Sequence, residues 1–253
     1  MEKAFYSGTS GLILPVPNKQ YYPSEFRDKS RLNYYGSLFN SIEINSSFYK
    51  IPMQATVKKW AESVPEDFKF TFKLWREITH IKGFSFDPEQ VQHFIETINQ
   101  VGTKKGCLLV QFPPSMGTRY FPQLTLLLNT IREADPTHDW NLALEFRDAA
   151  WYQESTYHLM NEFKAGLVIH DKPRAITPMI TQEANFIYLR FHGPNGDYKG
   201  SYEADFLTEY ASYIQEWINE GKTVFVYFNN TAGDAIRNLQ TLSNEVHQRA
   251  SIL

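Results

Sequence analysis

Short hydrophobic runs recur along the chain at intervals of about 25 to 40 residues, and each has the length of a strand rather than of a helix. Several of them alternate between apolar and polar positions, which is the period of a β-strand. The pattern predicts eight strands, at 5–9, 41–45, 68–73, 107–111, 142–145, 166–170, 186–190 and 223–228.

Helical periodicity fills most of the gaps between these strands. After the third strand, Asp87 suits an N-cap and Pro88 the first helical position, and apolar residues follow at 91, 94, 95 and 98. Similar stripes run through 124–131 and 206–217, and Gly221 is expected to end the second of them. The gap 172–185 is the exception, because prolines at 173 and 178 interrupt any helix.

Strands that alternate with helices pair in parallel through right-handed crossovers. Eight units of about 30 residues favour a closed barrel over an open sheet. The sequence therefore predicts an α/β fold, a single TIM-type (β/α)8 barrel over residues 1–253, with a weak or irregular sixth helix.

Charge and composition narrow the function classes. A net charge of -3 argues against a duplex-DNA partner, which calls for a basic face. No signal peptide and no apolar run of about 18 residues are found, so a cytoplasmic protein with no membrane partner is expected, of undetermined oligomeric state. The one cysteine, Cys107, opens an apolar run and is expected to be a small buried hydrophobe.

The predicted strands begin apolar and end polar. In a parallel barrel these ends meet at one rim, where enzymes of this fold place their chemistry. The candidate catalytic residues are the carboxylates and imidazole of Glu43, Glu145, Asp171 and His192. The candidate substrate-binding residues are Asn45, Lys73, Gln111, Arg147, Arg190, Asn229 and Asn230.

The same charges also fit a structural network that closes the top of the barrel. Glu145 could pair with Arg147 or Arg190, and Glu43 with Lys73. Aromatic residues in the loops after the strands could form a stacking surface for a base or sugar, or could cover the loops' own contacts. They are Tyr22, Phe48, Tyr49, Trp75, Trp151, Tyr198 and Tyr202.

The last two loops, 190–196 and 229–235, contain glycines, and the second opens a helix. Many barrels bind phosphate at this place with glycine-rich backbone and a helix N-terminus. Asp234 would repel an anion, and Asn230 or Thr231 could instead cap the helix.

Motifs spread over nearly the whole chain resemble those of the YecE-like family, also called DUF72. The matching segments lie in order at 8–11 (GTSG), 21–23 (YYP), 39–49 (FNSIEINSSFY), 111–115 (QFPPS), 145–147 (EFR) with Trp151, 189–193 (LRFHG) and 227–231 (YFNNT). The resemblance implies a TIM-type barrel and brings no established reaction. After Gly11 the chain has LILP where the family commonly has Trp and Tyr, so the resemblance assigns no role to this first loop.

Three classes of function fit these residues. The first is an enzyme that acts on a small anionic compound, phosphorylated or nucleotide-like, by acid and base chemistry. Lys73, Arg190 and Arg147 would hold the anion, and a rim carboxylate assisted by His192 would move the proton.

The second class is a divalent-metal-dependent phosphoester hydrolase that uses the rim carboxylates with His170 and His192 as ligands. No HExxH motif occurs, and nearby Lys and Arg compete for the carboxylates, so no metal or other cofactor is assigned. The third class is a non-catalytic module for a nucleotide, sugar or single-stranded nucleic acid. Glycoside hydrolysis is less favoured, because Gln111 and Arg190 stand where a large glycosidase group of this fold has acids.

Overall fold

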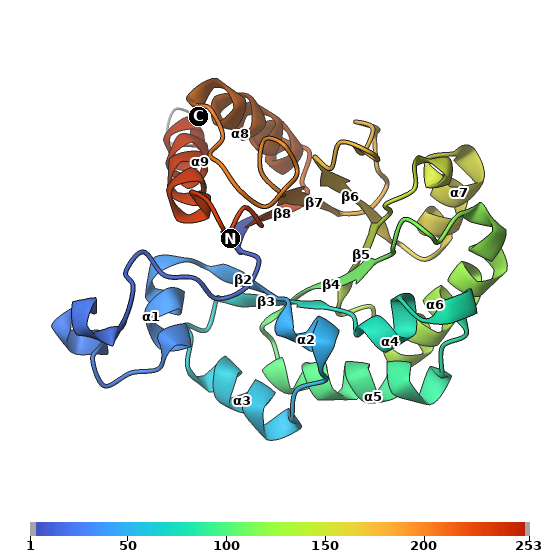
Figure 1. The fold of residues 1–253 in the computed structure, drawn as a ribbon, viewed down its shortest axis with the longest axis horizontal. Helices are drawn as coiled ribbons and strands as arrows, with labels where there is room; N and C mark the ends of the chain where they lie inside the picture. The colour runs from blue at the N-terminus through green and yellow to red at the C-terminus, as the bar shows by residue number, and fades with distance from the viewer. Residues whose placement is uncertain (1–3, 251–253) are drawn as a thin grey trace.

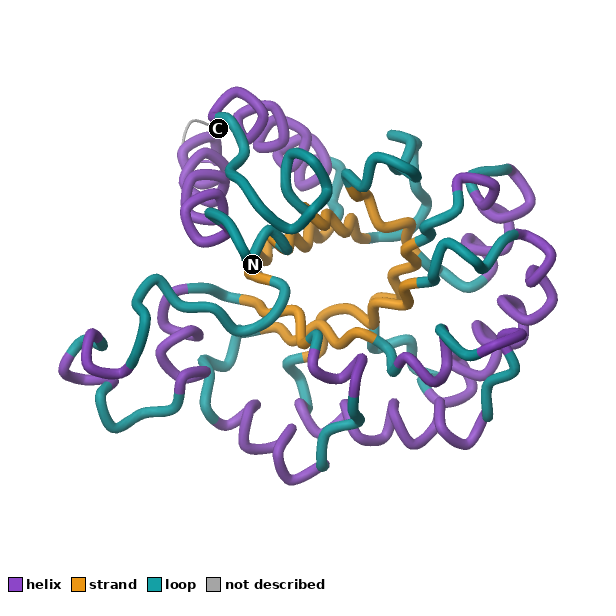
Figure 2. The backbone as a smooth tube through the Cα atoms, in the orientation of Figure 1, coloured by secondary structure: helices purple, strands orange, loops and turns teal. Residues whose placement is uncertain are grey.

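The computed structural model of the protein describes residues 4–250, which form eight parallel strands in a nearly closed barrel with helices around it (Figures 1 and 2). This is the predicted TIM-type architecture. The strands are β1 (Phe5–Thr9), β2 (Ser41–Ile44), β3 (Lys69–Lys73), β4 (Lys105–Gln111), β5 (Asn141–Glu145), β6 (Gly166–His170), β7 (Phe186–Phe191) and β8 (Thr223–Phe228).

The hydrogen-bonded order is β1-β8-β7-β6-β5-β4-β3-β2, so the first and last strands of this order, β1 and β2, form the seam of the barrel. Near the rim a single parallel bridge between Ser10 and Glu43 joins them. A Cβ atom at Gly8 would lie 2.0 Å from the carbonyl oxygen of Ser41. Only glycine therefore allows β1 to come this close to β2.

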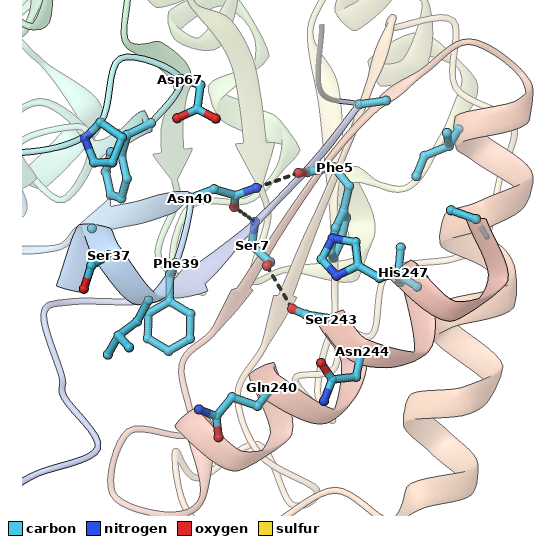
Figure 3. A pocket seen from close by; sticks show the side chains of 18 of the residues that line it. Phe5, Ser7, Ser37, Phe39, Asn40, Asp67, Gln240, Ser243, Asn244 and His247 are labelled. Carbon is cyan, nitrogen blue, oxygen red and sulfur yellow. Dashed lines mark hydrogen bonds between the residues drawn. The ribbon is translucent and has the colours of Figure 1, made fainter. Parts of the chain in front are cut away.

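Side chains complete the seam where backbone pairing is missing. Asn40 accepts from the backbone N–H of Ser7 at 2.8 Å and donates to the carbonyl of Phe5 at 2.9 Å (Figure 3). The hydroxyl of Tyr35 accepts from the N–H of Thr9 at 2.8 Å. These contacts satisfy polar backbone groups that an open sheet edge would leave unpaired.

Helices cover the outside of the barrel. They are α1 (Arg31–Leu38), α2 (Ser46–Tyr49), α3 (Gln54–Glu62), α4 (Arg76–Thr79), α5 (Pro88–Ile98), α6 (Phe121–Ala134), α7 (Glu154–Glu162), α8 (Ala204–Asn219) and α9 (Ala235–Ala250). Single 3-10 turns occur at Lys19–Tyr21, Ser24–Phe26, Lys82–Phe84, Asn99–Val101, Thr118–Tyr120 and Ala149–Trp151. Within residues 4–250, no helix combines the length and the hydropathy that a membrane crossing requires.

The predicted helix signals are confirmed. Asp87 caps α5 by accepting from the N–H of Glu89 at 2.9 Å, and Pro88 is the first residue of that helix. α8 ends at Asn219, just before Gly221, whose φ of 82° suits a glycine. No helix forms between His170 and Phe186, as the two prolines of this gap predict.

Five of the eight strands differ from the prediction by one or two residues at one end. β3, β4 and β5 begin at Lys69, Lys105 and Asn141, and β7 runs on to Phe191. For β4 and β5, strand pairing uses backbone groups, so polar residues at the strand start join the ladder even though they precede the hydrophobic run. β2 instead ends one residue early, because Asn45 has the helical φ and ψ of -76° and -21° and precedes α2.

The barrel encloses a small core of its own, which includes Tyr6, Leu109, Val168, Tyr188 and Phe225. Cys107 belongs to this cluster and is fully buried, so its prediction as a buried hydrophobe is confirmed. Two further clusters lie between the strands and the helices, one over β2 to β6 and one beneath α8 and α9. The polar rim therefore lies above closely packed apolar side chains inside the barrel.

Candidate functional site

The polar strand ends meet at the carboxyl-terminal mouth of the barrel, where they surround a cavity of about 160 Å³. Six of the seven predicted substrate-binding residues line it, and none of the four predicted catalytic residues does. Its lining consists of Asn45, Phe48, Tyr49, Lys73, Gln111, Arg147, Arg190, Tyr198 and Asn229.

Arg190, at the end of β7, connects two carboxylates across the barrel. Its Nε lies 3.0 Å from Oε2 of Glu43, and its Nη2 lies 2.8 Å from Oε1 of the same residue. Its Nη1 lies 3.1 Å from Oε2 of Glu145. All three side chains are buried, so these are strong charge-assisted bonds that fix the guanidinium in one orientation.

Glu43 receives two further hydrogen bonds, from the hydroxyls of Ser10 and Tyr188. Burial by itself raises the pKa of Glu43, but the charge of Arg190 and these hydrogen bonds outweigh it and hold the pKa below its usual value. The carboxylate is therefore ionised at neutral pH. The sequence prediction missed Tyr188, although strand alternation places it on the same side of β7 as Arg190.

Glu145, at the end of β5, forms a second ion pair with Arg147. Burial raises the pKa of this carboxyl, whereas the charges of Arg147 and Arg190 lower it, and the net pKa lies well below the usual range. Arg147 also donates from Nη2 to Nε2 of His192 at 3.0 Å. Glu145 thus holds two arginines beside the cavity.

The ring of His192 connects Asp171 to both arginines. Its Nδ1 lies 3.0 Å from Oδ1 of Asp171, and its Nε2 lies 3.0 Å from Nη1 of Arg190. A guanidinium can only donate and a carboxylate can only accept, so the proton sits on Nδ1 and Nε2 is the acceptor. Burial, partly offset by Asp171, lowers the pKa of His192 to about 4, and the ring is neutral at neutral pH.

Lys73, at the end of β3, is the third cation of the cavity. Its Nζ lies 4.0 Å from the centre of the Phe48 ring. Phe48 reaches this place because α2 follows β2 directly, with the hydroxyl of Ser47 2.7 Å from the carbonyl oxygens of Ile44 and Lys73. Burial first, and then the charge of Arg190, lower the pKa of Lys73 to about 7.

The predicted pairing of Glu43 with Lys73 is therefore wrong, because Arg190 occupies both oxygens of Glu43. The predicted pairing of Glu145 with Arg147 or Arg190 is confirmed for both arginines. The physical reason is geometric. A planar guanidinium at the centre of the mouth bridges two carboxylates at once, which an ammonium group cannot do with the same geometry.

Two polar atoms in the cavity wall are buried without a hydrogen-bond partner in the described part of the chain, the Nε of Arg147 and the Oδ1 of Asn45. Buried polar atoms are nearly always paired, so such atoms at a cavity indicate that water or a ligand completes them. The amides of Gln111 and Asn229 lie beside them in the same wall.

The aromatic loop residues divide into two groups. Phe48, Tyr49 and Tyr198 line the cavity, and Tyr49 is 68% exposed. Tyr22, Trp151 and Tyr202 are buried, and Trp75 packs against the core outside the barrel. Most of the predicted stacking surface is therefore interior packing, and only three aromatic rings border the cavity.

The glycine-bearing loops after β7 and β8 bind each other. The N–H groups of Ala232 and Asp234 donate to the carbonyls of Tyr198 and Gly200, both at 3.1 Å, and that of Gly233 donates to Asn230 at 2.9 Å. These three N–H groups are not available to a phosphate, so they do not form the predicted phosphate-binding site.

Asn230 is fully buried and donates to the carbonyl of Gly200 at 3.0 Å and to Asn238 at 2.9 Å. It ties the loops together and does not line the cavity, unlike its neighbour Asn229. Strand alternation explains the difference, because Asn229 shares its side with Tyr227 of the barrel interior, whereas Asn230 shares its side with Phe228 of the outer core.

Two of the cavities that are larger than the rim cavity bear on the site. One of about 470 Å³ shares Gln111, Arg147 and Tyr198 with the rim cavity and extends it toward Lys172 and Arg174. The other, of about 630 Å³, lies outside the seam between α1 and α9 (Figure 3). Asp67 and His247 are the titratable groups among the described residues that line it, so it lacks the charge cluster found at the rim.

The His, Cys, Asp and Glu side chains at the described rim are engaged by other groups. In the described range 4–250, no three His, Cys, Asp or Glu side chains are placed to hold one together. Glu43 and Glu145 are occupied by arginines, and the Nε2 of His170 lies 2.9 Å from the carbonyl of Phe146. The second class of function therefore finds no ligand set among these residues.

Comparisons with known proteins give relatives without an assigned reaction. The UPF0759 protein YunF of Bacillus subtilis is 28% identical over 242 residues and covers 84% of each chain. The UPF0759 protein YecE of Escherichia coli is 28% identical over 100 residues, which cover 40% of this chain and 37% of YecE.

Solved structures show the same fold. A DUF72 family protein from Enterococcus faecalis superposes with a TM-score of 0.78 at 23% identity and covers 96% of this chain and 95% of its own. A second, from Thermotoga maritima, has a TM-score of 0.70 at 23% identity and covers 98% and 100%. The family model described as "Protein of unknown function DUF72" matches residues 6–252. With that match over almost its whole length, the chain belongs to the DUF72 family.

Proposed function

We propose that the protein is an enzyme that binds a small anionic compound in the rim cavity and transforms it there. One observation carries the proposal: among residues 4–250, the charged side chains that line the cavity are the cations Lys73, Arg147 and Arg190, without a carboxylate. Such a wall attracts an oxoanion such as a phosphate or carboxylate.

The buried carboxylates stabilise the cluster of three cations from outside the cavity. Glu43 and Glu145 remain ionised and neutralise most of the charge of the two arginines, so that three cations can approach one another. Because each carboxylate is held by several donors, the guanidinium groups are fixed before a ligand arrives. A preorganised site loses less free energy to ordering when it binds its ligand.

An incoming oxoanion would contact the groups that lack partners. The Nε of Arg147 makes no hydrogen bond within the described residues, and the Nζ of Lys73 faces the same cavity. Arg147 keeps its Nη2 on His192, so its orientation does not depend on the ligand. The adjoining cavity beside Lys172 leaves room for the remainder of the molecule.

Proton transfer in this proposal falls to Lys73. Its pKa of about 7 lets the ammonium group lose and regain a proton near neutral pH, which suits a general acid or base. Glu43, Glu145, Asp171 and His192 do not line the cavity and act through the arginines. They are positioning residues rather than proton donors.

Isothermal titration calorimetry with inorganic phosphate tests the anion site. We expect one phosphate to bind the parent at neutral pH, and Arg147→Met to weaken this binding at least about tenfold, or about 1.4 kcal/mol. Arg119→Met is the matched control, because Arg119 is exposed, stacks 4.7 Å from Tyr120 and lies outside the cavity. Equal phosphate affinity of the parent and Arg147→Met, or no binding by either, would overturn the proposal.

A further inference from the structure

Lys73 stands apart from the other two cations of the rim cavity. The residue is 9% exposed, yet its Nζ forms no hydrogen bond and no ion pair among the described residues. Its one specific neighbour is the ring of Phe48. A buried lysine whose role is only to balance charge is normally paired with a carboxylate, and here both nearby carboxylates are taken by arginines.

The surroundings destabilise the ammonium form of Lys73 relative to a lysine in water. Burial removes the water that would solvate an ammonium ion, and the charges of Arg190 and Arg147 repel a third positive charge. The attraction of Glu145 and Glu43 offsets this only in part. A lysine in these surroundings offers an unprotonated nitrogen, and with it a nucleophile, at neutral pH.

We propose that Lys73 is a nucleophile that forms a Schiff base with an aldehyde or ketone carrying an anionic group, an oxo acid or a sugar phosphate. The inference rests on the proposed function, because the arginines must hold the anionic group while its carbonyl carbon lies against Nζ. Arg147 and Lys73 line one cavity of about 160 Å³, so a carbonyl a few bonds away from the anion reaches the amine.

The chemistry balances without a cofactor. The lone pair of Nζ adds to the carbonyl carbon, and the carbon–oxygen π electrons move to the oxygen. Both amine protons pass to this oxygen, which leaves as water and gives the carbon–nitrogen double bond. Once protonated, this imine withdraws electrons from neighbouring bonds, so an adjacent C–H or C–C bond can break.

Reductive trapping tests the inference on the intact protein. The parent is incubated near neutral pH with sodium cyanoborohydride and, separately, glyoxylate, pyruvate or dihydroxyacetone phosphate. Hydride addition to the imine leaves a stable secondary amine, so the protein gains the mass of the probe less one oxygen atom. Peptide mass spectrometry then locates the modified lysine.

We expect at least one probe to modify Lys73 before any other lysine, and excess inorganic phosphate to slow the reaction. Lys73→Arg should abolish the adduct, because a guanidinium does not form an imine under these conditions. Lys58→Arg, at an exposed position of α3, is the matched control and should leave the adduct unchanged.

The two proposals fail in different ways. If phosphate binds the parent but no probe modifies Lys73, the Schiff-base inference is overturned and the anion site stands. If the adducts fall on exposed lysines and are insensitive to phosphate, the inference is equally overturned. If phosphate does not bind the parent at all, the proposed function fails first.

Discussion

Arg190 and Glu43 form a two-point ion pair across the mouth of the barrel, with Nε 3.0 Å from Oε2 and Nη2 2.8 Å from Oε1. The two residues are 147 positions apart in the sequence. Their contact joins β2 to β7 and brings one guanidinium to the centre of the candidate site.

Replacing Glu43 by glutamine is expected to destabilise the fold. The change leaves Arg190 buried with one carboxylate less, and breaking a buried ion pair from one side costs about 3–5 kcal/mol. Urea unfolding of Glu43→Gln measures the loss. Glu66→Gln is the control, because Glu66 is 85% exposed in its ion pair with Lys104, and a change of less than about 1 kcal/mol is expected there. Equal midpoints for the two variants would contradict the account.

Stability should fall as the pH is lowered from neutral. The pKa values of His80 and His192 drop from 6.5 to about 4 on folding, chiefly through burial, so the unfolded chain binds more protons between these values. The pKa values of Glu43 and Glu145 are also lowered, chiefly by the arginines acting against burial, and their contribution is lost below about pH 4.5. The free energy of unfolding should therefore decline from about pH 6.5 and fall more steeply below 4.5. Constant stability from pH 7 to pH 4 would count against these assignments.

Lys73 extends the same trend, stability that rises with pH, to the alkaline side. Its pKa is about 7 in the folded protein and 10.5 ordinarily, so the unfolded chain binds the extra proton between these values and stability rises with pH across this window. Lys73→Met has no such proton to lose. As the pH rises from 7 to 9.5, the unfolding free energy of the parent should increase relative to that of Lys73→Met. No shift would mean that Lys73 titrates as an ordinary lysine.

Asp171→Asn is expected to weaken anion binding, although Asp171 does not line the cavity. The asparagine can donate to Nδ1 of His192, which moves the ring proton to Nε2 and sets it against the donors of Arg147 and Arg190. We expect phosphate affinity to fall about tenfold, or about 1.4 kcal/mol. The ¹⁵N chemical shifts of His192 should report the exchanged tautomer, which a purely structural role of Asp171 would not alter. Asp197→Asn, at an exposed loop position, is the control, and an unchanged tautomer in Asp171→Asn would refute the assignment.

Much of the fold follows from the sequence because its signals are local. Hydrophobic runs, the cap at Asp87 and the prolines at 173 and 178 each act on a few neighbouring residues. Even so, β4 begins two residues before its hydrophobic run, because backbone pairing accepts Lys105 and Gly106 as readily as apolar residues.

The site could be predicted as a set of residues, but the pairing among them could not. The identity of the partner of Glu43 depends on which side chain crosses the barrel, and the sequence pattern alone suggested Lys73 rather than Arg190. Alternation along β8 does carry the information that separates Asn229 from Asn230. Which loop aromatics become buried depends on how the loops pack, and no local pattern distinguishes Trp151 from Tyr198.

The location of a bound oxoanion tests the central claim most directly. Crystals soaked in selenate should show an anomalous selenium peak in the rim cavity, within reach of Arg147 and Lys73 and displaced when phosphate is added. Selenate sites confined to other parts of the surface, with solvent alone between the three cations, would contradict the account.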